Sequence, residues 1–423
     1  MTNVLVVGNG AREHALCHVL RRSPMLRSLR CAPGNAGTAL LGENVSASLD
    51  DVEQLLRVAR QSPTDLVVVG PEVPLAAGLA DRLRELGIAT FGPGAAAARI
   101  EASKAWAKEL MRAVGVPTAR ATVVTSRAQA QRAVEQVGFP AVLKADGLAA
   151  GKGVTVAADQ AEADAAMEEL FVRRSLGAAS DVVVVEEYLA GREVSLLALC
   201  DGERLALLPP ARDYKAALDG GLGPNTGGMG AYTRPSFITP SLLARVRVEI
   251  MEPVVRDLAR RGTPFVGVLY AGLMVTSTGP RVIEFNCRFG DPEAQVVLPL
   301  VESDFLEALL AVAEGRLDPA TLRWSDHEAC GVVVASGGYP AAYGTGQEIA
   351  GLDAVPPDVL VFHAGTRWRE DGAVVTAGGR VLTVVGRGAT LDEARARAYA
   401  GATSIGFEGG RYRRDIGDEG VPK

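Results

Sequence analysis

The chain has 423 residues, of which 48% are apolar and 22% charged, and its formal net charge is −6. This composition is typical of globular proteins and excludes a disordered chain. A negative net charge argues against a general nucleic-acid binder, which carries a basic surplus. At about 100–200 residues per domain, the length predicts two to four domains.

Targeting signals and cysteine chemistry are also restricted by the sequence. No stretch of about 18 residues is free of charge and glycine, so no membrane span is expected. The first eight residues lack a basic start and a long apolar run, and they predict a strand rather than a signal peptide. The five cysteines are scattered and odd in number. They indicate neither a disulfide framework nor a zinc site and predict a reducing cytoplasm.

The first hundred residues alternate between apolar runs and amphipathic segments. This alternation predicts a parallel sheet with helical crossovers. Every expected strand runs into Gly or Pro, and ligands of open α/β sheets bind at such carboxyl ends. We therefore expect a site at this edge. The expected strands are residues 4–7, 29–32, 66–69 and 88–91, and the expected helices are 12–22, 51–60 and 74–86.

A second unit begins near residue 101 and contains a small α+β piece followed by longer β runs. Its expected strands are residues 118–124, 141–145, 154–157, 182–186, 265–275 and 281–286. Its expected helices are residues 103–114, 128–136, 161–173 and 240–260.

A third unit begins near residue 326, with expected strands at 332–335, 374–376 and 381–385. Asp371-Gly372 and Gly378-Gly379 are typical hairpin turns. Thr390 and Glu393 form a capping box that opens a helix to about residue 405. The residues after 411 are expected to form a loose tail.

Lysine is rare, because only six of the 44 basic residues are lysine. Two of them belong to the strongest local signal, in which Lys144 on a strand precedes a loop at 146–153 with three glycines and Lys152. Glycines let backbone amides approach an anion, and the lysine supplies charge. The spacing is not that of a Walker A loop. The alternative is a flexible hairpin with a solvated Lys152, although an unpaired buried Lys144 would cost several kcal/mol.

The first strand-to-helix turn, residues 8–14, resembles a dinucleotide-binding loop only in Gly8 and Gly10. Glu13 occupies the position of the third glycine, so no NAD site is predicted. Free amides with Arg12 and His14 nearby suit a substrate phosphate. The alternative is a plain tight turn.

Residues 284–288 place Glu284 and Asn286 on one face of a strand. Their oxygens suit Mg²⁺, and Arg288, one step further, suits a phosphate or a carboxylate. The alternative is a salt-bridged edge strand. Two more carboxylates, Asp291 and Glu293, follow at once.

The glycine-dense segment 224–232 wraps a small polar substrate or forms a mobile loop, and the residues leave both readings open. Asp213 and Lys215 lie just upstream. The sequence contains neither a Gly-x-Ser-x-Gly elbow nor a matched nucleophilic triad.

In this order, these segments resemble the ATP-grasp ligases, and among them especially the phosphoribosylamine–glycine ligase family of purine biosynthesis. The resemblance runs from residue 4 to about 416, and its most specific motif is Arg288-Phe289-Gly290-Asp291-Pro292-Glu293. The other matching segments are residues 8–15, 33–38, 69–72, 144–153 and 224–232.

The resemblance implies a multidomain α/β and α+β fold: an N-terminal parallel α/β domain (1–101), an ATP-grasp domain (102–325) with an inserted lid (about 118–190), and a C-terminal mixed α/β domain (326–423). It implies ATP-dependent ligation of glycine to 5-phosphoribosylamine through glycyl phosphate, giving glycinamide ribonucleotide, ADP and phosphate in de novo purine biosynthesis. It further implies Mg²⁺ or Mn²⁺, a cytoplasmic monomer or weak dimer without nucleic-acid or membrane partners, and transient contact with the preceding pathway enzyme.

The resemblance also implies roles for individual residues. The catalytic set is Arg288, Lys144, Asp213 and Asp291. The nucleotide set is Lys104, Lys144, Gly151, Lys152 and Gly153 for the phosphates, Glu186, Glu187 and Leu189 for adenine, and Glu193 for ribose. The metal set is Glu284 and Asn286; residues 270–273 offer no carboxylate for a second metal. The substrate set is Gly8, Asn9, Gly10, Arg12, Asn35, Gly37, Glu72, Lys215, Asn225, Thr226, Gly227, Gly228 and Arg288.

Three rival functions remain at this stage. They are an ATP-grasp enzyme that uses another acid or amine, a nicotinamide-dependent oxidoreductase, and a nucleotide-binding regulatory module without turnover. The failed glycine pattern at Glu13 argues against the second, and the full set of Lys, Glu, Asn and Arg argues against the third.

Overall fold

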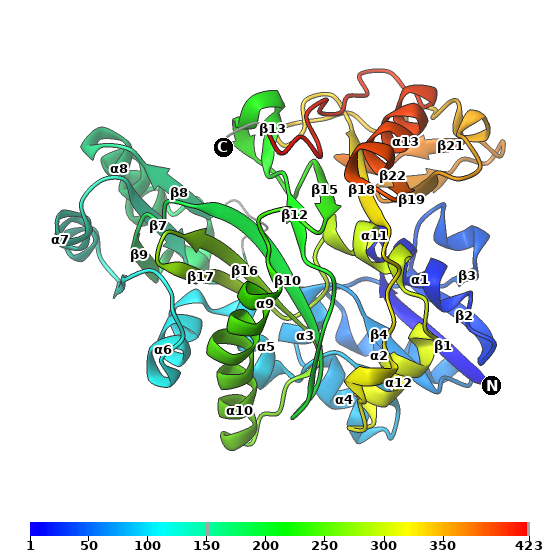
Figure 1. Ribbon diagram of the computed structural model, residues 1–423, viewed down its shortest axis with the longest axis horizontal. Coiled ribbons are helices and arrows are strands. Elements are labelled where there is room, and N and C mark those ends of the chain that lie inside the picture. The colour runs from blue at the N-terminus through cyan, green and yellow to red at the C-terminus, as the bar shows by residue number, and fades with distance from the viewer. Residues whose placement is uncertain (149–152, 421–423) are drawn as a thin grey trace.

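The computed structural model describes residues 1–148 and 153–420. Gly151 and Lys152 of the expected phosphate loop lie outside these residues. The chain forms three neighbouring units that follow the sequence order, with the N-terminal unit and the last unit on one side and a smaller sheet on the other (Figure 1).

The N-terminal unit is a five-stranded sheet of order β3-β2-β1-β4-β5, and every neighbouring pair is parallel, as expected. Its central strands are runs of Val and Leu that are buried on both faces, which is typical of a parallel sheet covered by helices. The strands are β1 (Thr2–Gly8), β2 (Leu26–Pro33), β3 (Glu43–Asn44), β4 (Leu66–Val69) and β5 (Ala89–Phe91).

The helices of this unit depart from expectation in two places. The single helix expected at residues 74–86 is wrong, because Gly78 adopts a φ of 85° and divides it into two short helices. An unexpected helix follows β5 directly. The helices are α1 (Ala11–Leu20), α2 (Val52–Gln61), α3 (Glu72–Ala76), α4 (Leu79–Glu85) and α5 (Ala95–Ala102).

The next unit carries a four-stranded antiparallel sheet of order β6-β9-β7-β8, called the small sheet below. Apolar residues of α7 and α8 pack with it into a separate core. The α-helix expected at residues 161–173 ends at Met167, and a π-helical segment follows it directly. The elements are α6 (Lys104–Val114), β6 (Ala121–Val124), α7 (Arg127–Val137), β7 (Ala141–Ala145), β8 (Val154–Ala157), α8 (Gln160–Met167) and β9 (Val183–Glu187).

A nine-stranded sheet, called the large sheet below, forms the centre of the molecule, with order β17-β16-β10-β12-β15-β18-β22-β19 and β11 beside β10. It passes from the middle unit into the last unit where β15 pairs with β18. The two units therefore share one sheet. Its strands are β10 (Arg192–Asp201), β11 (Leu205–Leu207), β12 (Ala211–Asp213), β15 (Gly230–Thr233), β16 (Val266–Thr276), β17 (Gly279–Asn286), β18 (Glu328–Ala335), β19 (Leu360–His363) and β22 (Arg380–Gly388).

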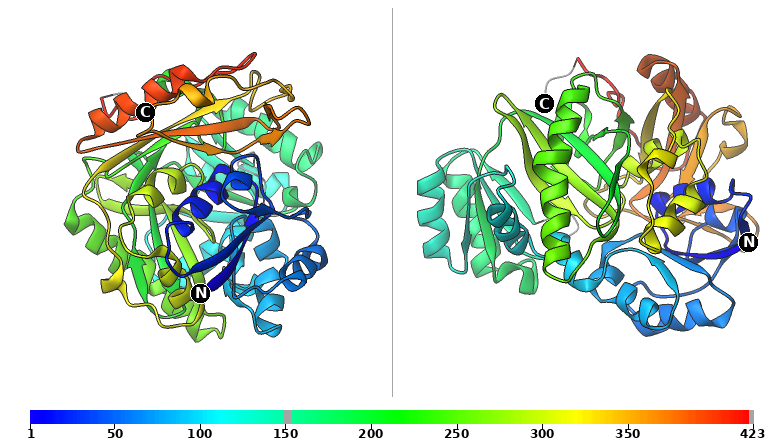
Figure 2. Two further views of the ribbon diagram at one scale, coloured as in Figure 1. Left: turned by 90° about the vertical axis from the view of Figure 1, so that its right-hand side faces the viewer. Right: turned by 60° about the horizontal axis from the view of Figure 1, so that its bottom comes forward.

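Helices cover both faces of the large sheet (Figure 2). The helix expected at residues 240–260 is three consecutive helical segments that pack on β10 and β16. On the other face, α11 (Glu293–Val297) and α12 (Phe305–Ala313) share a core with α1 and β1. The N-terminal unit is thereby fixed against the central sheet. No helix in residues 1–148 and 153–420 is long and apolar enough to cross a membrane.

Two expectations for the last unit are wrong. Gly378-Gly379 makes no hairpin, because β21 (Val374–Thr376) pairs with β20 (Thr366–Trp368) while β22 joins the large sheet. The tail is packed rather than loose up to residue 420. Ile416 is fully buried, and the Tyr214 hydroxyl donates to the Asp418 carbonyl at 3.2 Å. The tail thus covers the junction between α13 (Leu391–Ser404) and the large sheet.

Candidate active site

The first strand-to-helix turn is organised by Glu13. Its carboxylate accepts from the Gly10 amide at 2.7 Å and from Arg12 Nε at 2.6 Å. A Cβ at Gly70 would lie 2.0 Å from Glu13 Oε1, and one at Gly8 would lie 2.4 Å from its Cγ. The carboxylate therefore fills the space between two strand ends and caps its own helix. Sequence reasoning treated Glu13 only as a failed glycine and missed this role.

Asn35 ties the second strand end to the first and to the last unit. Its amide group donates to the carbonyls of Asn9 at 2.9 Å and His363 at 2.7 Å. Its Oδ1 accepts from the Gly37 amide at 2.9 Å. A Cβ on Gly37 would meet the His14 ring at 2.2 Å, so glycine is required there. Gly8, Gly10, Asn35 and Gly37, all predicted to bind substrate, are thus brought together, although the Asn35 side chain is engaged by protein groups.

Arg288 lies between two carboxylates from the N-terminal side. Its Nη2 is 2.8 Å from Glu101 Oε1, and its Nε is 3.2 Å from Glu72 Oε2. Burial would lower the pKa of Arg288, but Glu101 and Glu72 together raise it above its ordinary value. Burial raises the pKa of Glu101 in turn. Glu72 was predicted from sequence, whereas Glu101, at the end of an unexpected helix, was missed.

Two lysines share one glutamate at the base of the small sheet. Lys144 Nζ is 3.0 Å from Glu186 Oε2, and Lys108 Nζ is 3.2 Å from Glu186 Oε1. All three side chains are buried. Burial lowers the pKa of Lys108 to about 8, with Glu186 opposing the change. Lys144 and Glu186, which pair here, both belong to the predicted nucleotide set. Lys108 was not predicted, although lysine is rare in this chain.

Helix α6 presents Lys104 beside this cluster. The helix begins because the Ser103 hydroxyl caps it, accepting from the Trp106 amide. Lys104 Nζ donates to the Gly147 carbonyl at 3.0 Å, at the start of the loop 147–153. Lys104 and Lys108 are one helical turn apart and therefore project from the same side.

The predicted metal residues lie on β17. Glu284 and Asn286 are half-buried while Phe285 and Cys287 between and after them are buried, which confirms the alternation. Lys144 Nζ donates to the neighbouring Ile283 carbonyl at 3.3 Å. A carboxylate and an amide oxygen on one face fit a cation that keeps waters and phosphate ligands.

Opposite Glu284 on β16 stands Gly272, which offers no second carboxylate. Within residues 1–148 and 153–420, no group of three or more His, Cys, Asp or Glu side chains is placed to hold a metal ion. Within the described residues, the candidate cation-binding side chains are therefore Glu284 and Asn286 of β17.

Asp213 ends β12 and lies near Glu293, and Lys215 follows two residues later beside Glu193. Lys215 Nζ is 3.2 Å from Glu193 Oε2, and Glu193 raises the pKa of Lys215 well above its ordinary value. Glu293 accepts from the Ser195 hydroxyl at 2.8 Å and the Tyr270 hydroxyl at 2.9 Å. Burial raises the pKa of Glu293, and Asp213 adds to this effect.

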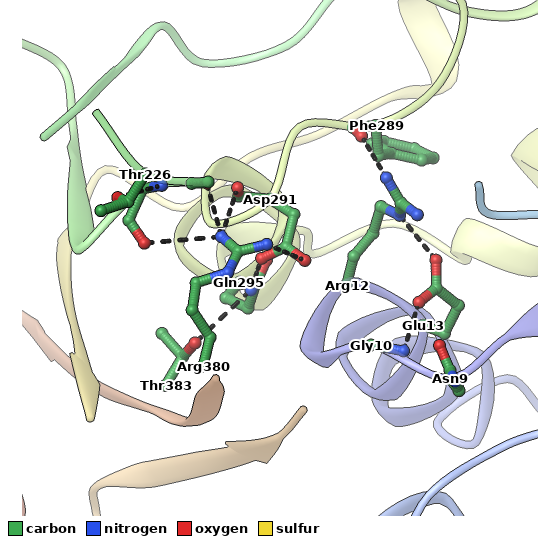
Figure 3. Close-up of polar contacts among 12 residues, drawn as sticks. Asn9, Gly10, Arg12, Glu13, Thr226, Phe289, Asp291, Gln295, Arg380 and Thr383 are labelled. Atoms are coloured by element: carbon green, nitrogen blue, oxygen red, sulfur yellow. Dashed lines mark hydrogen bonds and ion pairs between the residues drawn. The ribbon is translucent and has the colours of Figure 1, made fainter. Parts of the chain in front are cut away.

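The motif at residues 288–293 lies beside the glycine-dense segment 224–232, and the two approach each other at Asp291 (Figure 3). Asp291 Oδ1 accepts from Gln295 Nε2 at 2.6 Å, and its Oδ2 is 3.0 Å from Arg380 Nη2. Arg12 Nη1 donates to the Phe289 carbonyl at 3.2 Å, so the N-terminal loop also reaches this motif. Arg380 was missed because its contacts are distant in sequence.

Some predicted residues stand apart from these clusters. Glu187 pairs with Arg120 at 2.6 Å and Arg281 at 3.0 Å, so its side chain is committed to surface arginines. Asn225 is exposed on β14 (Leu222–Asn225), which pairs with β13 (Ala216–Leu218) rather than with the large sheet.

Comparisons with known proteins cover nearly all of the chain. The three models of phosphoribosylglycinamide synthetase match here in chain order: the N domain at residues 2–101, the ATP-grasp (A) domain at 102–294 and the C domain at 329–419. The phosphoribosylamine–glycine ligase of Nostoc is 49% identical, with 98% of each chain covered, and that of Streptomyces coelicolor is 51% identical, again with 98% of each chain.

Comparison with solved structures indicates the same family. The crystal structure of phosphoribosylamine–glycine ligase from Thermotoga maritima superimposes with a TM-score of 0.86 at 34% identity, covering 98% of this chain and 99% of that one. A biotin carboxylase from Campylobacter jejuni shares the fold alone, at 13% identity and a TM-score of 0.75 with 97% and 93% coverage. The chain belongs to the phosphoribosylglycinamide synthetase family.

Proposed function

We propose that the chain ligates glycine to 5-phosphoribosylamine with ATP, giving glycinamide ribonucleotide, ADP and phosphate in purine biosynthesis. Relatives near 50% identity over the full length carry the name of this reaction. The structural observation that carries the proposal is the line of groups along β17. Lys144 contacts this strand beside Glu284, and Arg288 follows the strand at its end. A nucleotide phosphate, a cation and a carboxylate substrate therefore have neighbouring partners.

The reaction needs no enzyme nucleophile. A glycine carboxylate oxygen attacks the γ-phosphorus of ATP; the new O–P bond forms as the bond to the β-phosphate oxygen breaks and ADP leaves. The amine of phosphoribosylamine then attacks the acyl carbon, the C–N bond forms, and phosphate leaves as the amine loses a proton to solvent. Positioning and charge neutralisation supply the catalysis in such phosphoryl transfers.

The lysine cluster suits the nucleotide end. We assign Lys104, Lys144 and the loop 147–153 to the phosphates, Glu186 with the backbone of Glu187 and Leu189 to adenine, and Glu193 to ribose. Glu186 lies between the two lysines, and an ionised carboxylate accepts hydrogen bonds only. An amino group on the base satisfies such an acceptor, and an oxo group at the same position repels it.

We assign a divalent cation, Mg²⁺ or Mn²⁺, to Glu284 and Asn286. When bound, it supplies positive charge to the nucleotide phosphates. Lys104 lies at the same end; burial lowers its pKa, and the Glu284 carboxylate opposes this lowering.

The N-terminal loops and the motif after β17 suit the acceptor and the glycine. We assign the phosphate of phosphoribosylamine to the start of α1 with Arg12, where helix amides favour an anion. We assign Arg288 to the charge of the acyl phosphate, with Asp213 and Asp291 as partners of the amine. The remaining substrate residues are Asn9, Glu72, Lys215 and the loop 225–228.

We further propose three domains, at residues 1–101, 102–325 and 326–423. The small sheet acts as a lid inserted in the second domain. An acyl phosphate hydrolyses in water, so closure protects it. We place the reaction in the cytoplasm, in a monomer or weak dimer that receives unstable phosphoribosylamine by transient contact with the enzyme that makes it.

The test is ADP release with purified protein. Release should require glycine, phosphoribosylamine and Mg²⁺ together, and mass spectrometry should find glycinamide ribonucleotide in equal amount. Glu284→Gln serves as the matched control, because it removes one charge and keeps the shape. Equal ADP release with another acid or amine would assign the chain to a different ligation.

A further inference from the structure

One arginine of the last unit contacts two segments of the site. Arg380 begins β22, and its guanidinium lies between Asp291 and the segment that begins at Thr226 (Figure 3). Its Nη1 donates to the Gly227 carbonyl at 2.5 Å and to the Asp291 carbonyl at 2.8 Å, while its Nη2 is 3.0 Å from Asp291 Oδ2. A single fork of donors thus satisfies two carbonyls and a carboxylate.

Two glycines of this loop lie close against Arg380 and Pro292, and the positive φ of Gly228 favours glycine there. A Cβ on Gly227 would lie 2.9 Å from Arg380 Cζ. Gly228 has a φ of 109°, and a Cβ there would lie 2.4 Å from Pro292 Cδ. The planar guanidinium therefore lies directly on the loop, and the loop lies directly on the motif. Lysine, a point charge on a flexible chain, cannot reproduce this arrangement.

The contact reaches the N-terminal unit through Asp291. The Asp291 carboxylate lies against Gly10, since a Cβ on Gly10 would be 3.5 Å from its Oδ2. Gln295 holds the other oxygen at 2.6 Å. Asp291 is therefore oriented by Gln295 and Arg380 and faces the start of α1, where the acceptor phosphate is assigned.

We propose that Arg380 is a positioning residue for the acceptor phosphoribosylamine: it holds the 226–228 loop and Asp291 in the arrangement that receives the amine. This inference rests on the proposed function. The nucleotide cluster of Lys108, Lys144 and Glu186 is built from α6, β7 and β9, which are separate from β22. Arg380 therefore acts on the second half of the reaction, and the last unit becomes part of the acceptor site.

The experiment compares Arg380→Met and Arg380→Lys with Arg387→Met, an exposed arginine on the same strand. Phosphoribosylamine is formed in solution from ribose 5-phosphate and ammonia. The measurements are the KM for phosphoribosylamine, the KM for ATP, and the ratio of ADP released to glycinamide ribonucleotide formed. Wild-type protein must first show ADP release that depends on both substrates; if it does not, the proposed function fails independently of any variant.

Arg380→Met should raise the KM for phosphoribosylamine by about 10- to 100-fold, because a small misplacement of reacting groups has effects of this size. The KM for ATP should stay within about twofold of wild type, and ADP should exceed product because glycyl phosphate is lost to water. The KM for phosphoribosylamine of Arg380→Lys should lie between those of wild type and Arg380→Met. Arg387→Met should match wild type.

A merely structural role would lower the active fraction or the melting temperature and leave both KM values and the coupling ratio unchanged. That result would overturn the proposal, as would an equal rise in the KM for ATP. If Arg380→Met fails to fold, Arg380→Lys decides: a KM for phosphoribosylamine equal to that of Arg387→Met refutes the positioning role.

Discussion

Replacing Arg288 by methionine should reduce both turnover and stability, and the structure allows the two effects to be separated. The Arg288 side chain is 19% exposed and the Glu101 side chain 8%, with 2.8 Å between Nη2 and Oε1. Removing one partner of a buried pair leaves the other charge uncompensated, which costs about 3–5 kcal/mol. At about 2–4 °C per kcal/mol for a unit of this size, the melting temperature should fall by at least about 6 °C.

Adding Glu101→Gln should restore the melting temperature without restoring turnover. The amide oxygen of glutamine can still accept from the Cys287 amide, which Glu101 now binds at 2.8 Å, while the buried negative charge is gone. Turnover should stay about 10²–10³-fold below wild type in both variants, because Arg288 is the cation assigned to the developing charge of the reaction.

The pH dependence of the single variant tests the same reasoning. Burial raises the pKa of Glu101 above 4.5, and loss of Arg288, which lowers it, raises it further. A carboxyl with a raised pKa binds more protons in the folded state, so its contribution to stability is lost as pH rises. The melting deficit should therefore be larger at about pH 8 than at about pH 5, and absent with Glu101→Gln. An unchanged melting temperature in Arg288→Met, or a double variant that stays unstable, would refute the account.

Three further predictions concern other parts of the site. Because the pKa of Lys108 is about 8, the KM for ATP should rise between about pH 7 and pH 9 as Glu186 loses a cation; Lys108→Arg, which stays protonated, should flatten this profile, and a persistent rise would contradict it. Burial lowers the pKa of His363 to about 4, so the unfolded chain binds this proton first and stability should fall by up to about 3 kcal/mol as pH drops from 6.5 to 4; thermal unfolding of His363→Asn with an equal slope would disprove this. Gly228→Ala, which places a Cβ 2.4 Å from Pro292 Cδ, should cut product formation by about 100-fold, and near-normal turnover would show that the loop can rearrange.

Much of the fold follows from local pattern. β4 and β7 have the expected bounds because these mostly apolar runs are flanked by Asp65 and Gly70 and by Pro140 and Asp146. The alternation along β17 likewise placed Glu284 and Asn286 on one face before any contact was known.

The errors come from features that local sequence patterns do not show. Helix 74–86 is divided by the backbone of Gly78, whose positive φ no amphipathic pattern reveals. The tail is ordered because Ile416 is buried beside α13, a contact that chain order does not indicate.

The site residues that were missed share the same property. Glu101, Lys108 and Arg380 act through partners on other elements, and each lies outside the motifs that carry the resemblance. Lys108 alone left a signal, since lysine is rare in this chain. Strand periodicity and glycine spacing locate the groups assigned to a ligand, whereas the groups that hold them in place become visible only in three dimensions.

The central claim is that the glycine carboxylate is activated by accepting the γ-phosphoryl group of ATP. Glycine whose carboxylate oxygens carry a heavy isotope tests it directly, with the mass of the released phosphate as the readout. The account predicts one labelled oxygen in each phosphate, because the acyl C–O bond breaks when the amine attacks. Phosphate that carries no label while glycinamide ribonucleotide forms at the normal rate would contradict it.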